Sequence, residues 1–145
     1  MMTKDVVLPR KGTFGNKVPQ MKSKRFRLSS SATERMKQIK GRTGFKTENI
    51  IPRIGLCLSL KENGLPNPDD YDQEGKEYNR YTLLGEWDSF YTAIIREHMN
   101  EHGLSEDEMD EYFRAHLNRG VLIAYALIKN LTDIPRLVEV SQQEQ

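Results

Sequence analysis

The chain is poor in the residues that build covalent or metal-bound frameworks. Its 145 residues include one cysteine and three histidines. The single cysteine, Cys57, excludes an internal disulfide and a zinc site made of several cysteines. Because Cys57 lies at core spacing in a predicted helix, we interpret it as a packing residue rather than a nucleophile.

Long hydrophobic runs are missing as well. The nearest candidate, residues 121–131, is interrupted by Lys129 and Asn130 and is shorter than the ~20 residues that a membrane span needs. No apolar signal-peptide core follows the first residues. Aromatic residues make up 8% of the chain and charged residues 30%. We therefore expect a cytoplasmic, soluble helical domain with wide solvated faces, or one that completes its core in an oligomer.

The charge that is present is divided between two halves of the chain. Residues 1–61 carry 15 lysines and arginines against three acidic residues, whereas residues 62–145 carry seven against 18. The formal net charge of +1 thus conceals a basic half and an acidic half. This segregation is typical of a protein that presents a basic face to an anionic partner.

Local patterns predict a mainly α-helical fold with a short N-terminal strand. Glycines, prolines and basic residues without apolar periodicity predict a flexible basic arm over residues 1–23, with a short strand at residues 6–8. Residues 25–28 alternate polar and apolar side chains, as in a half-buried strand. We assign residues 24–140 to one domain and residues 141–145 to a frayed tail.

Two short helices are predicted after the strand. Three serines can cap the first of them, and Gly41 and Gly44 are its predicted stops. Thr47 or Asn49 caps the second, which ends near residue 63. If the cap is Asn49, Pro52 falls in the first turn, where its missing N–H costs nothing.

Two longer helices are predicted beyond a loop at residues 65–80. The third helix runs from Thr82 to Gly103, and the fourth begins with a capping box at Ser105 and ends at Pro135. The apolar faces assigned to these two helices include Trp87, Phe90, Leu127 and Leu131.

The predicted strand needs a partner, because one strand is not stable alone. Residues 25–28 pair either with their own copy in a second subunit, which is the simpler arrangement, or with their own chain. The sequence leaves both open. A strand followed by two helices is the order of ribbon-helix-helix proteins, whose paired strands enter a major groove.

Basic residues around this strand and the first helix carry the clearest functional signal. Cations of this kind contact phosphates, which gives salt-dependent binding with little sequence information. We therefore predict nucleic-acid binding by the segment that contains Lys22, Lys24, Arg25, Arg27, Arg35, Lys37, Lys40, Arg42, Lys46 and Arg53.

Two further patterns resemble metal sites. Residues 69–75 are similar to a calcium loop, but its twelfth position is Tyr81 where a bidentate glutamate is required. Residues 98–102 match the inverted zinc-protease string, yet they fall in a last helical turn, where basic side chains are expected for electrostatic reasons. We expect neither to bind a metal. The carboxylates near residues 69–88 leave a metal-dependent DNA-nicking enzyme as an alternative, and the strand–helix–helix order leaves a ribbon-helix-helix transcription regulator.

Three strings resemble one known family. They are Gly41-Arg42-Thr43-Gly44, residues 49–60, and residues 75–88, which contain Asn79-Arg80-Tyr81-Thr82-Leu83-Leu84-Gly85-Glu86. Together they resemble DndE, the small protein of bacterial DNA phosphorothioation systems, which replace a non-bridging backbone oxygen with sulfur. The resemblance covers about residues 24–101.

This resemblance implies a compact, mainly helical, ribbon-helix-helix-like protein that forms a homotetramer and binds duplex DNA, with a preference for nicked duplex. It implies no cofactor and no catalysis by this chain. The partners would be a cysteine desulfurase, an iron–sulfur ATP pyrophosphatase-like subunit and an ATPase subunit. By position, the family's DNA face would fall on Lys24, Arg25, Arg27, Arg35, Lys37, Lys40, Arg42 and Lys46.

Overall fold

Helices make up most of the structure, a computed structural model that describes residues 21–47 and 49–136. The strands are β1 (Arg25–Arg27) and β2 (Glu77–Asn79), and the helices are α2 (Ser30–Thr43), α3 (Ile50–Leu60), α4 (Arg80–Leu84), α5 (Asp88–Glu101) and α6 (Met109–Leu127). Short 3-10 helices cover Pro68–Asp70, Gly85–Trp87 and Glu106–Glu108. The predicted mainly helical fold with a short N-terminal strand is confirmed. Among the described residues, no helix is both long and apolar enough to cross a bilayer.

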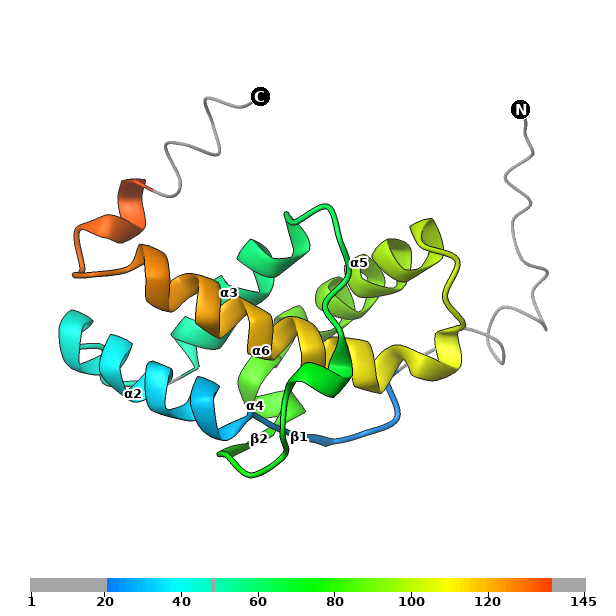
Figure 1. Ribbon diagram of the computed structural model, residues 1–145, viewed down its shortest axis with the longest axis horizontal. Coiled ribbons are helices and arrows are strands. Elements are labelled where there is room, and N and C mark those ends of the chain that lie inside the picture. The colour runs from blue at the N-terminus through cyan, green and yellow to red at the C-terminus, as the bar shows by residue number, and fades with distance from the viewer. Residues whose placement is uncertain (1–20, 48, 137–145) are drawn as a thin grey trace.

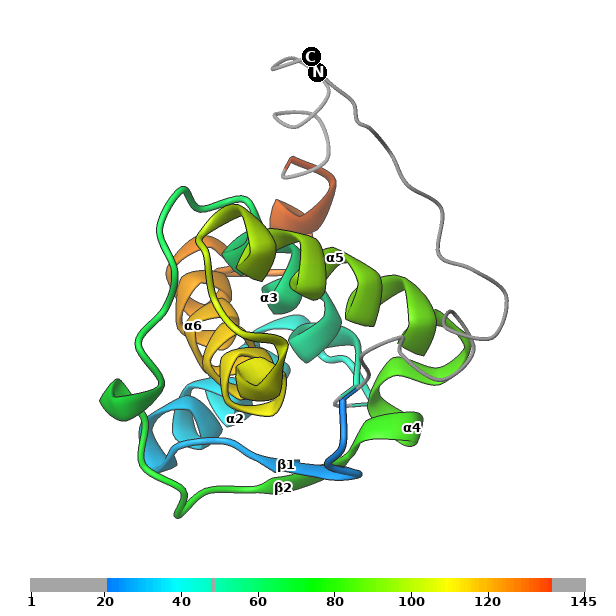
Figure 2. The same cartoon turned by 90° about the vertical axis from the view of Figure 1, so that its right-hand side faces the viewer.

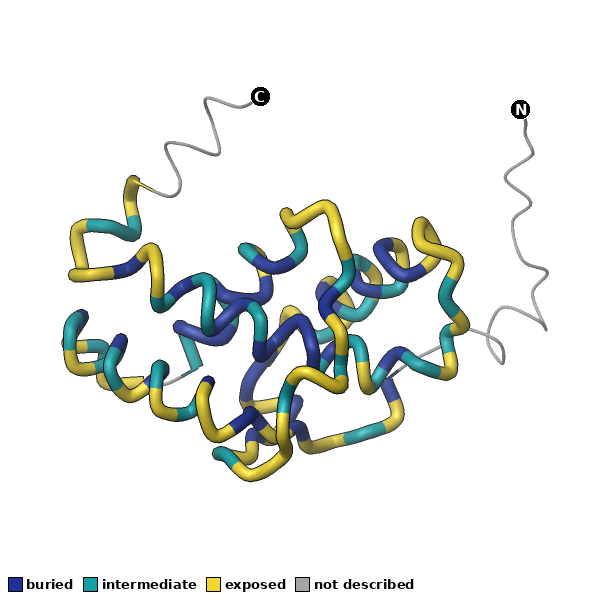
Figure 3. The backbone as a smooth tube through the Cα atoms, viewed as in Figure 1, coloured by how far each residue is buried: buried dark blue, intermediate teal, exposed yellow. Residues whose placement is uncertain are grey.

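Helix α6 is the element around which the others pack. It crosses the middle of the molecule, and α2, α3 and α5 lie against it (Figure 1). Its inward face follows helical spacing through Phe113, Leu117, Val121 and Ala124, all of which are fully buried. The buried stretches in the centre of Figure 3 therefore follow α6 and its neighbours.

Two glycines allow α3 and α6 to cross with their backbones in contact. A Cβ atom added at Gly120 would lie 2.1 Å from the carbonyl oxygen of Gly55, and one added at Gly55 would lie 2.7 Å from the carbonyl carbon of Gly120. No larger residue fits at either position without moving a helix. The most extensive packing in the molecule, between α3 and α6, is centred on this crossing.

The predicted strand pairs within its own chain. β1 and β2 form an antiparallel ribbon in which Phe26 lies opposite Tyr78, and both side chains point inward. The Phe26 ring packs on Phe113 of α6 at a centroid distance of 4.5 Å. Pairing with a second subunit, the simpler expectation, is not what the described residues show. Treating residues 65–80 as loop alone was wrong, because β2 lies within them. Figure 2 shows the ribbon along one edge of the helical layer.

The acidic stretch before β2 is tied to α2 and α6. The carboxylate of Asp72 accepts hydrogen bonds from the backbone N–H and hydroxyl of Ser30, each 2.9 Å long, and from the N–H of Glu74. These bonds, with that from the Ser30 N–H the strongest, lower the pKa of Asp72. Arg114 donates to four carbonyl groups, those of Arg27, Pro68, Tyr71 and Asp72. The stretch therefore serves as a capping and bracing segment at the start of α2.

Helix ends agree in part with the predicted stops. Gly44, with φ +76°, terminates α2, whereas Gly41 lies inside the helix. Asn49 occupies the N-cap position of α3 without a side-chain bond, so Pro52 lies in the first turn, as one of the two alternatives required. Helix α3 ends at Leu60, three residues before the predicted end.

The third predicted helix is broken at Gly85. Its φ of +56° separates α4 from α5 and changes the face that later residues present. Trp87 and Phe90 are consequently 51% and 52% exposed, so this part of the predicted apolar face is not covered by the described residues.

The fourth predicted helix was too long, because α6 ends at Leu127 with Ile128 in an extended conformation. Leu127 and Leu131 are exposed, so their assignment to the core was also wrong.

The packed part of the chain begins before residue 24. Met21 is buried, and the backbone N–H groups of Lys22 and Ser23 donate to the carboxylate of Asp110 in α6. Residues 21–23 were predicted to belong to the flexible basic arm, but they are part of the packed domain. The predicted strand at residues 6–8 and the tail at 141–145 lie outside the described residues.

We predict that Gly120→Ala destabilises the fold by about 1–3 kcal/mol, because its methyl group meets the α3 backbone and forces the helices apart. Gly41→Ala is the matched control, since an added Cβ there has nothing within 4 Å and a helical alanine is favoured over glycine. Urea unfolding of both variants measures the difference. Equal stability of Gly120→Ala and the wild type would show that the helices do not depend on this contact.

Candidate nucleic-acid interface

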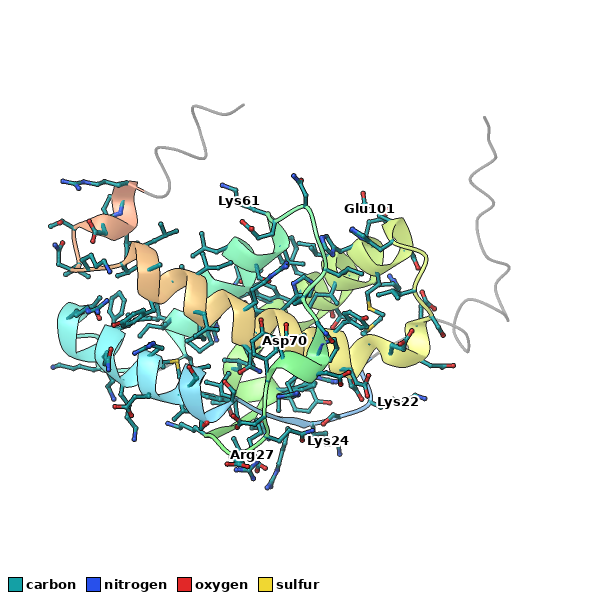
Figure 4. All side chains as sticks on the ribbon, viewed as in Figure 1. Lys22, Lys24, Arg27, Lys61, Asp70 and Glu101 are labelled. Carbon is teal, nitrogen blue, oxygen red and sulfur yellow. The ribbon has the colours of Figure 1, made fainter. Side chains whose placement is uncertain are left out.

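The cations predicted to bind DNA lie on the ribbon, on α2 and on the turn after it. Lys24 and Arg27 project from the ribbon edge of the molecule, away from Lys61 and Glu101 on the opposite edge (Figure 4). The alternation of β1 causes this arrangement, since Phe26 takes the buried position and the flanking arginines take the exposed ones. The strand therefore presents a basic outer face.

Glu77 partly neutralises that face. It lies on β2 opposite Arg27, and its carboxylate contacts the guanidinium of Arg25 at 3.1 Å and that of Arg27 at 2.9 Å. Arg27 also donates to the carbonyl of Gly75. All three ion-pairing side chains are well exposed, so these ion pairs are screened and weak. Two arginines share one carboxylate, which leaves the outer face with a net positive charge.

Lys24, Lys37 and Lys46 are the most available cations of the predicted set. All three are exposed, and their ammonium groups form no ion pair within the described residues. Lys40 is half-buried on α2. An exposed ammonium without a carboxylate partner can contact a phosphate without first breaking an ion pair.

Arg35 and Arg42 have a structural role that their sequence position did not predict. Both guanidinium groups lie over the ring of Tyr125 in α6, at 4.6 and 4.3 Å from its centroid. Arg42 also donates to the carbonyl oxygens of Tyr125 and Ile128, at the end of α6. It therefore caps α6 and fastens α2 to it.

Two cations of the acidic half join this surface and were missed. Lys129 lies 5.5 Å from the Tyr125 ring centroid, beside Arg35 and Arg42, and Lys76 lies 5.2 Å from the ring of Tyr78 on the ribbon. Counting charge by halves of the chain concealed both, because acidic residues surround them in the sequence. The spacing of Arg35 and Arg42, seven residues apart on one helix face, was the available signal that they meet a common partner.

An open groove of about 250 Å³ runs beside the ribbon. Its walls mix cations and carboxylates, so it does not have the uniform charge of a phosphate pocket. The lining residues are Ser23, Arg25, Phe26, Arg27, Gln73, Glu77, Asp110, Glu111 and Arg114.

The acidic and histidine motifs are not gathered into a metal site in the described part of the chain. Asp72 is engaged in capping α2, and Asp88 lies 3.0 Å from Arg80 in a partly buried ion pair. These contacts engage two of the carboxylates that the nicking-enzyme alternative considered as metal ligands.

Cys57 is exposed, so its interpretation as a packing residue was wrong. Its sulfur lies 3.6 Å from the hydroxyl of Tyr91. Burial, together with this contact, raises the pKa of that hydroxyl.

Solved structures share this fold. The chain is similar to the crystal structure of DndE from Escherichia coli B7A, involved in DNA phosphorothioation modification, with a TM-score of 0.56 and 23% identity over 69% of this chain and 95% of that one. It is also similar to a glycine-to-lysine mutant of DndE involved in DNA phosphorothioation, with a TM-score of 0.56 and 19% identity over 70% and 96% of the two chains. No curated protein matches the sequence.

The family comparison covers the ribbon, α2 and α6 together. The family described as DNA sulphur modification protein DndE matches residues 25–129, from the first residue of β1 to the lysine beside Tyr125. The match takes in more than two thirds of the chain and confirms the resemblance seen in its strings. The chain therefore belongs to the DndE family of DNA sulphur modification proteins.

Proposed function

We propose that this chain is a DNA-binding accessory subunit of a DNA phosphorothioation system. It binds the backbone of duplex DNA, with a preference for nicked duplex, and presents it for sulfur transfer by partner enzymes. The observation that carries the proposal is the exposed basic surface of the ribbon and α2 in a member of a DNA sulphur modification family. The chain itself performs no catalysis and acts in the cytoplasm.

In this proposal the lysines and the arginines of the basic surface make different contacts with DNA. Lys24, Lys37 and Lys46 contact phosphates directly, because nothing in the described chain occupies their ammonium groups. Arg25 and Arg27 approach the groove or the phosphates from the ribbon, in competition with their exposed ion pairs to Glu77. Phosphate contacts of this kind position a duplex without reading its sequence. This behaviour suits a modification subunit better than a regulator that recognises one palindromic site.

Assembly and partner contacts use other surfaces. Exposed aromatic side chains, those of Tyr81, Trp87 and Phe90, gather along α4 and α5, and an apolar surface of this kind supports a homotetramer. The acidic turn Glu106–Glu108 supports contacts with basic regions of the sulfur-transfer partners. These partners are a cysteine desulfurase, an iron–sulfur ATP pyrophosphatase-like subunit and an ATPase subunit.

We predict that the purified protein binds a singly nicked duplex more tightly than an intact duplex of identical sequence, with affinity that falls steeply as salt increases. Fluorescence anisotropy at two salt concentrations, with and without magnesium, measures both effects. Absence of binding would contradict the proposal, and magnesium-dependent cutting would establish the nicking enzyme instead. A strong preference for one palindromic sequence would favour a transcription regulator.

We predict that the combined variant Lys24→Ala, Lys37→Ala, Lys46→Ala binds all duplexes more weakly and lowers the slope of log K against log salt by about 1 per lost phosphate contact. Lys61→Ala is the matched control, because Lys61 is equally exposed but lies on the opposite edge (Figure 4). An equal loss of binding free energy per removed charge in both variants would show that overall charge, rather than this face, determines binding.

We predict that Glu77→Gln tightens DNA binding, by up to about 1 kcal/mol, because it releases two guanidinium groups from an exposed ion pair. Glu101→Gln makes the same change of charge on the far edge and should leave the affinity nearly unchanged. Titration of nicked duplex at low salt compares the two. Weaker binding by Glu77→Gln would mean that the pairing itself is needed to orient the arginines.

A further inference from the structure

All three histidines of the chain meet where α5, α6 and the end of α3 come together. The ring of His98 in α5 lies 4.9 Å from that of His102 and 5.1 Å from that of His116 in α6, measured between centroids. His116 is fully buried, and His98 is 9% exposed. In the sequence only His98 and His102 lie close together, within the motif at residues 98–102 that resembles a zinc-protease string. The fold brings His116 to them.

Hydrogen bonds tie the His116 ring to the end of α3. Arg119 donates from Nε to the hydroxyl oxygen of Ser59, at 2.8 Å, and an arginine can only donate. The same hydroxyl lies 2.9 Å from Nδ1 of His116. Because a hydroxyl group can both donate and accept, this contact fits either tautomer of the neutral ring.

Two ring nitrogens of the cluster are buried without a hydrogen-bond partner in the described chain. They are Nε2 of His116 and Nδ1 of His98, on rings packed edge to face. Neither nitrogen bonds to a carboxylate of the described chain. A protonated His116 would carry a hydrogen on both ring nitrogens, and the hydrogen on Nε2 would be buried without an acceptor among the described residues.

The charged surroundings of His116 disfavour its protonation further. Arg119 faces it from α6, and His98 and His102 face it from α5 and the turn after it. The acidic groups nearby, Tyr71 and Glu62, act on Arg119 instead. Burial first, and then the positive charge of Arg119, lower the pKa of His116 from 6.5 to about 3.

We propose that the histidine cluster is a pH-sensitive lock that holds the C-terminal end of α5 against α3 and α6 while His116 is neutral. Ser59 of α3 binds one side of the His116 ring, and His98 of α5 packs on the other. His102 extends the same connection, since its ring contacts the carbonyl oxygens of His98 and of Asn63, beyond the end of α3. This packing requires a neutral His116 ring. When His116 is protonated, the packing is lost and the end of α5 is released.

The direction of the pH effect follows from the difference in the pKa of His116 between the two states. Below pH 6.5 His116 is protonated in the opened chain but stays neutral in the folded one. The stabilisation is fully present above about pH 6.5, where His116 is neutral in both states. It is lost progressively as the pH falls from 6.5 toward 3, because only the opened or unfolded chain takes up the proton there. Acidification within this range should therefore loosen the end of α5 first.

Urea unfolding of the full chain at several pH values tests the lock, with His116→Asn as the key variant. Asparagine retains an acceptor for Ser59 but cannot be protonated. When the pH is lowered from 7 to 5, the unfolding equilibrium constant of the wild type should increase by a factor roughly 25 times larger than the factor for His116→Asn. His102→Asn removes one contact of the lock but leaves His116 able to take up a proton, so it should lower the stability and still show a pH dependence. Parallel curves for the wild type and His116→Asn would overturn the proposal.

Two measurements on the wild type keep the test decisive if His116→Asn fails to fold. Ring ¹⁵N shifts should show a neutral His116 ring down to pH 5, with free histidine as reference. Hydrogen exchange, corrected for its intrinsic pH dependence, should show opening of α5 near His98 at pH 5 before the rest of the core. Protonation of His116 in the folded protein near pH 6, or uniform exchange along the core, would overturn the lock.

Discussion

The close approach of α3 and α6 at Gly55 and Gly120 is the constraint on which the rest of the structure depends. With no side chain between them, the two backbones touch, and α6 becomes an axis that α2, α5 and the ribbon can all reach. The ribbon rests on this axis through the contact of Phe26 with Phe113. Its basic outer face is therefore positioned by a contact between two residues that carry no side chain at all.

Burial and pairing sort the cations of this protein into different tasks. Arg42 caps α6 and stacks on Tyr125, and Arg114 braces four carbonyl groups beside the ribbon. Lys24, Lys37 and Lys46 remain exposed and without an ion-pair partner in the described chain. Side chains with the same formal charge are therefore not equally available to bind an anion. Arg42 and Arg114, with planar and multiply donating groups, are used for internal structure, and these three lysines keep their charge available to solvent.

The acidic half of the chain is used in a comparable way. Asp72 stabilises the start of α2, Asp88 pairs with Arg80, and Asp110 holds the backbone of residues 22 and 23. Asp72 and Asp88, two of the carboxylates that could have suggested metal chemistry, are thus engaged in bonds to backbone and arginine.

The sequence by itself determined the helical class, the alternation of β1 and the family, because each of these depends on neighbouring residues or on local strings. It narrowed the ends of α2 to three serines and two glycines, of which the structure uses Ser29 and Gly44. Only the tertiary structure decided that β1 pairs with β2 some 50 residues away, since a three-residue alternation does not specify its partner. The same holds for the break at Gly85, which exposed Trp87, and for the meeting of His98 with His116. Local pattern specifies which face of an element is buried, but the element that covers it is selected by packing across the whole chain.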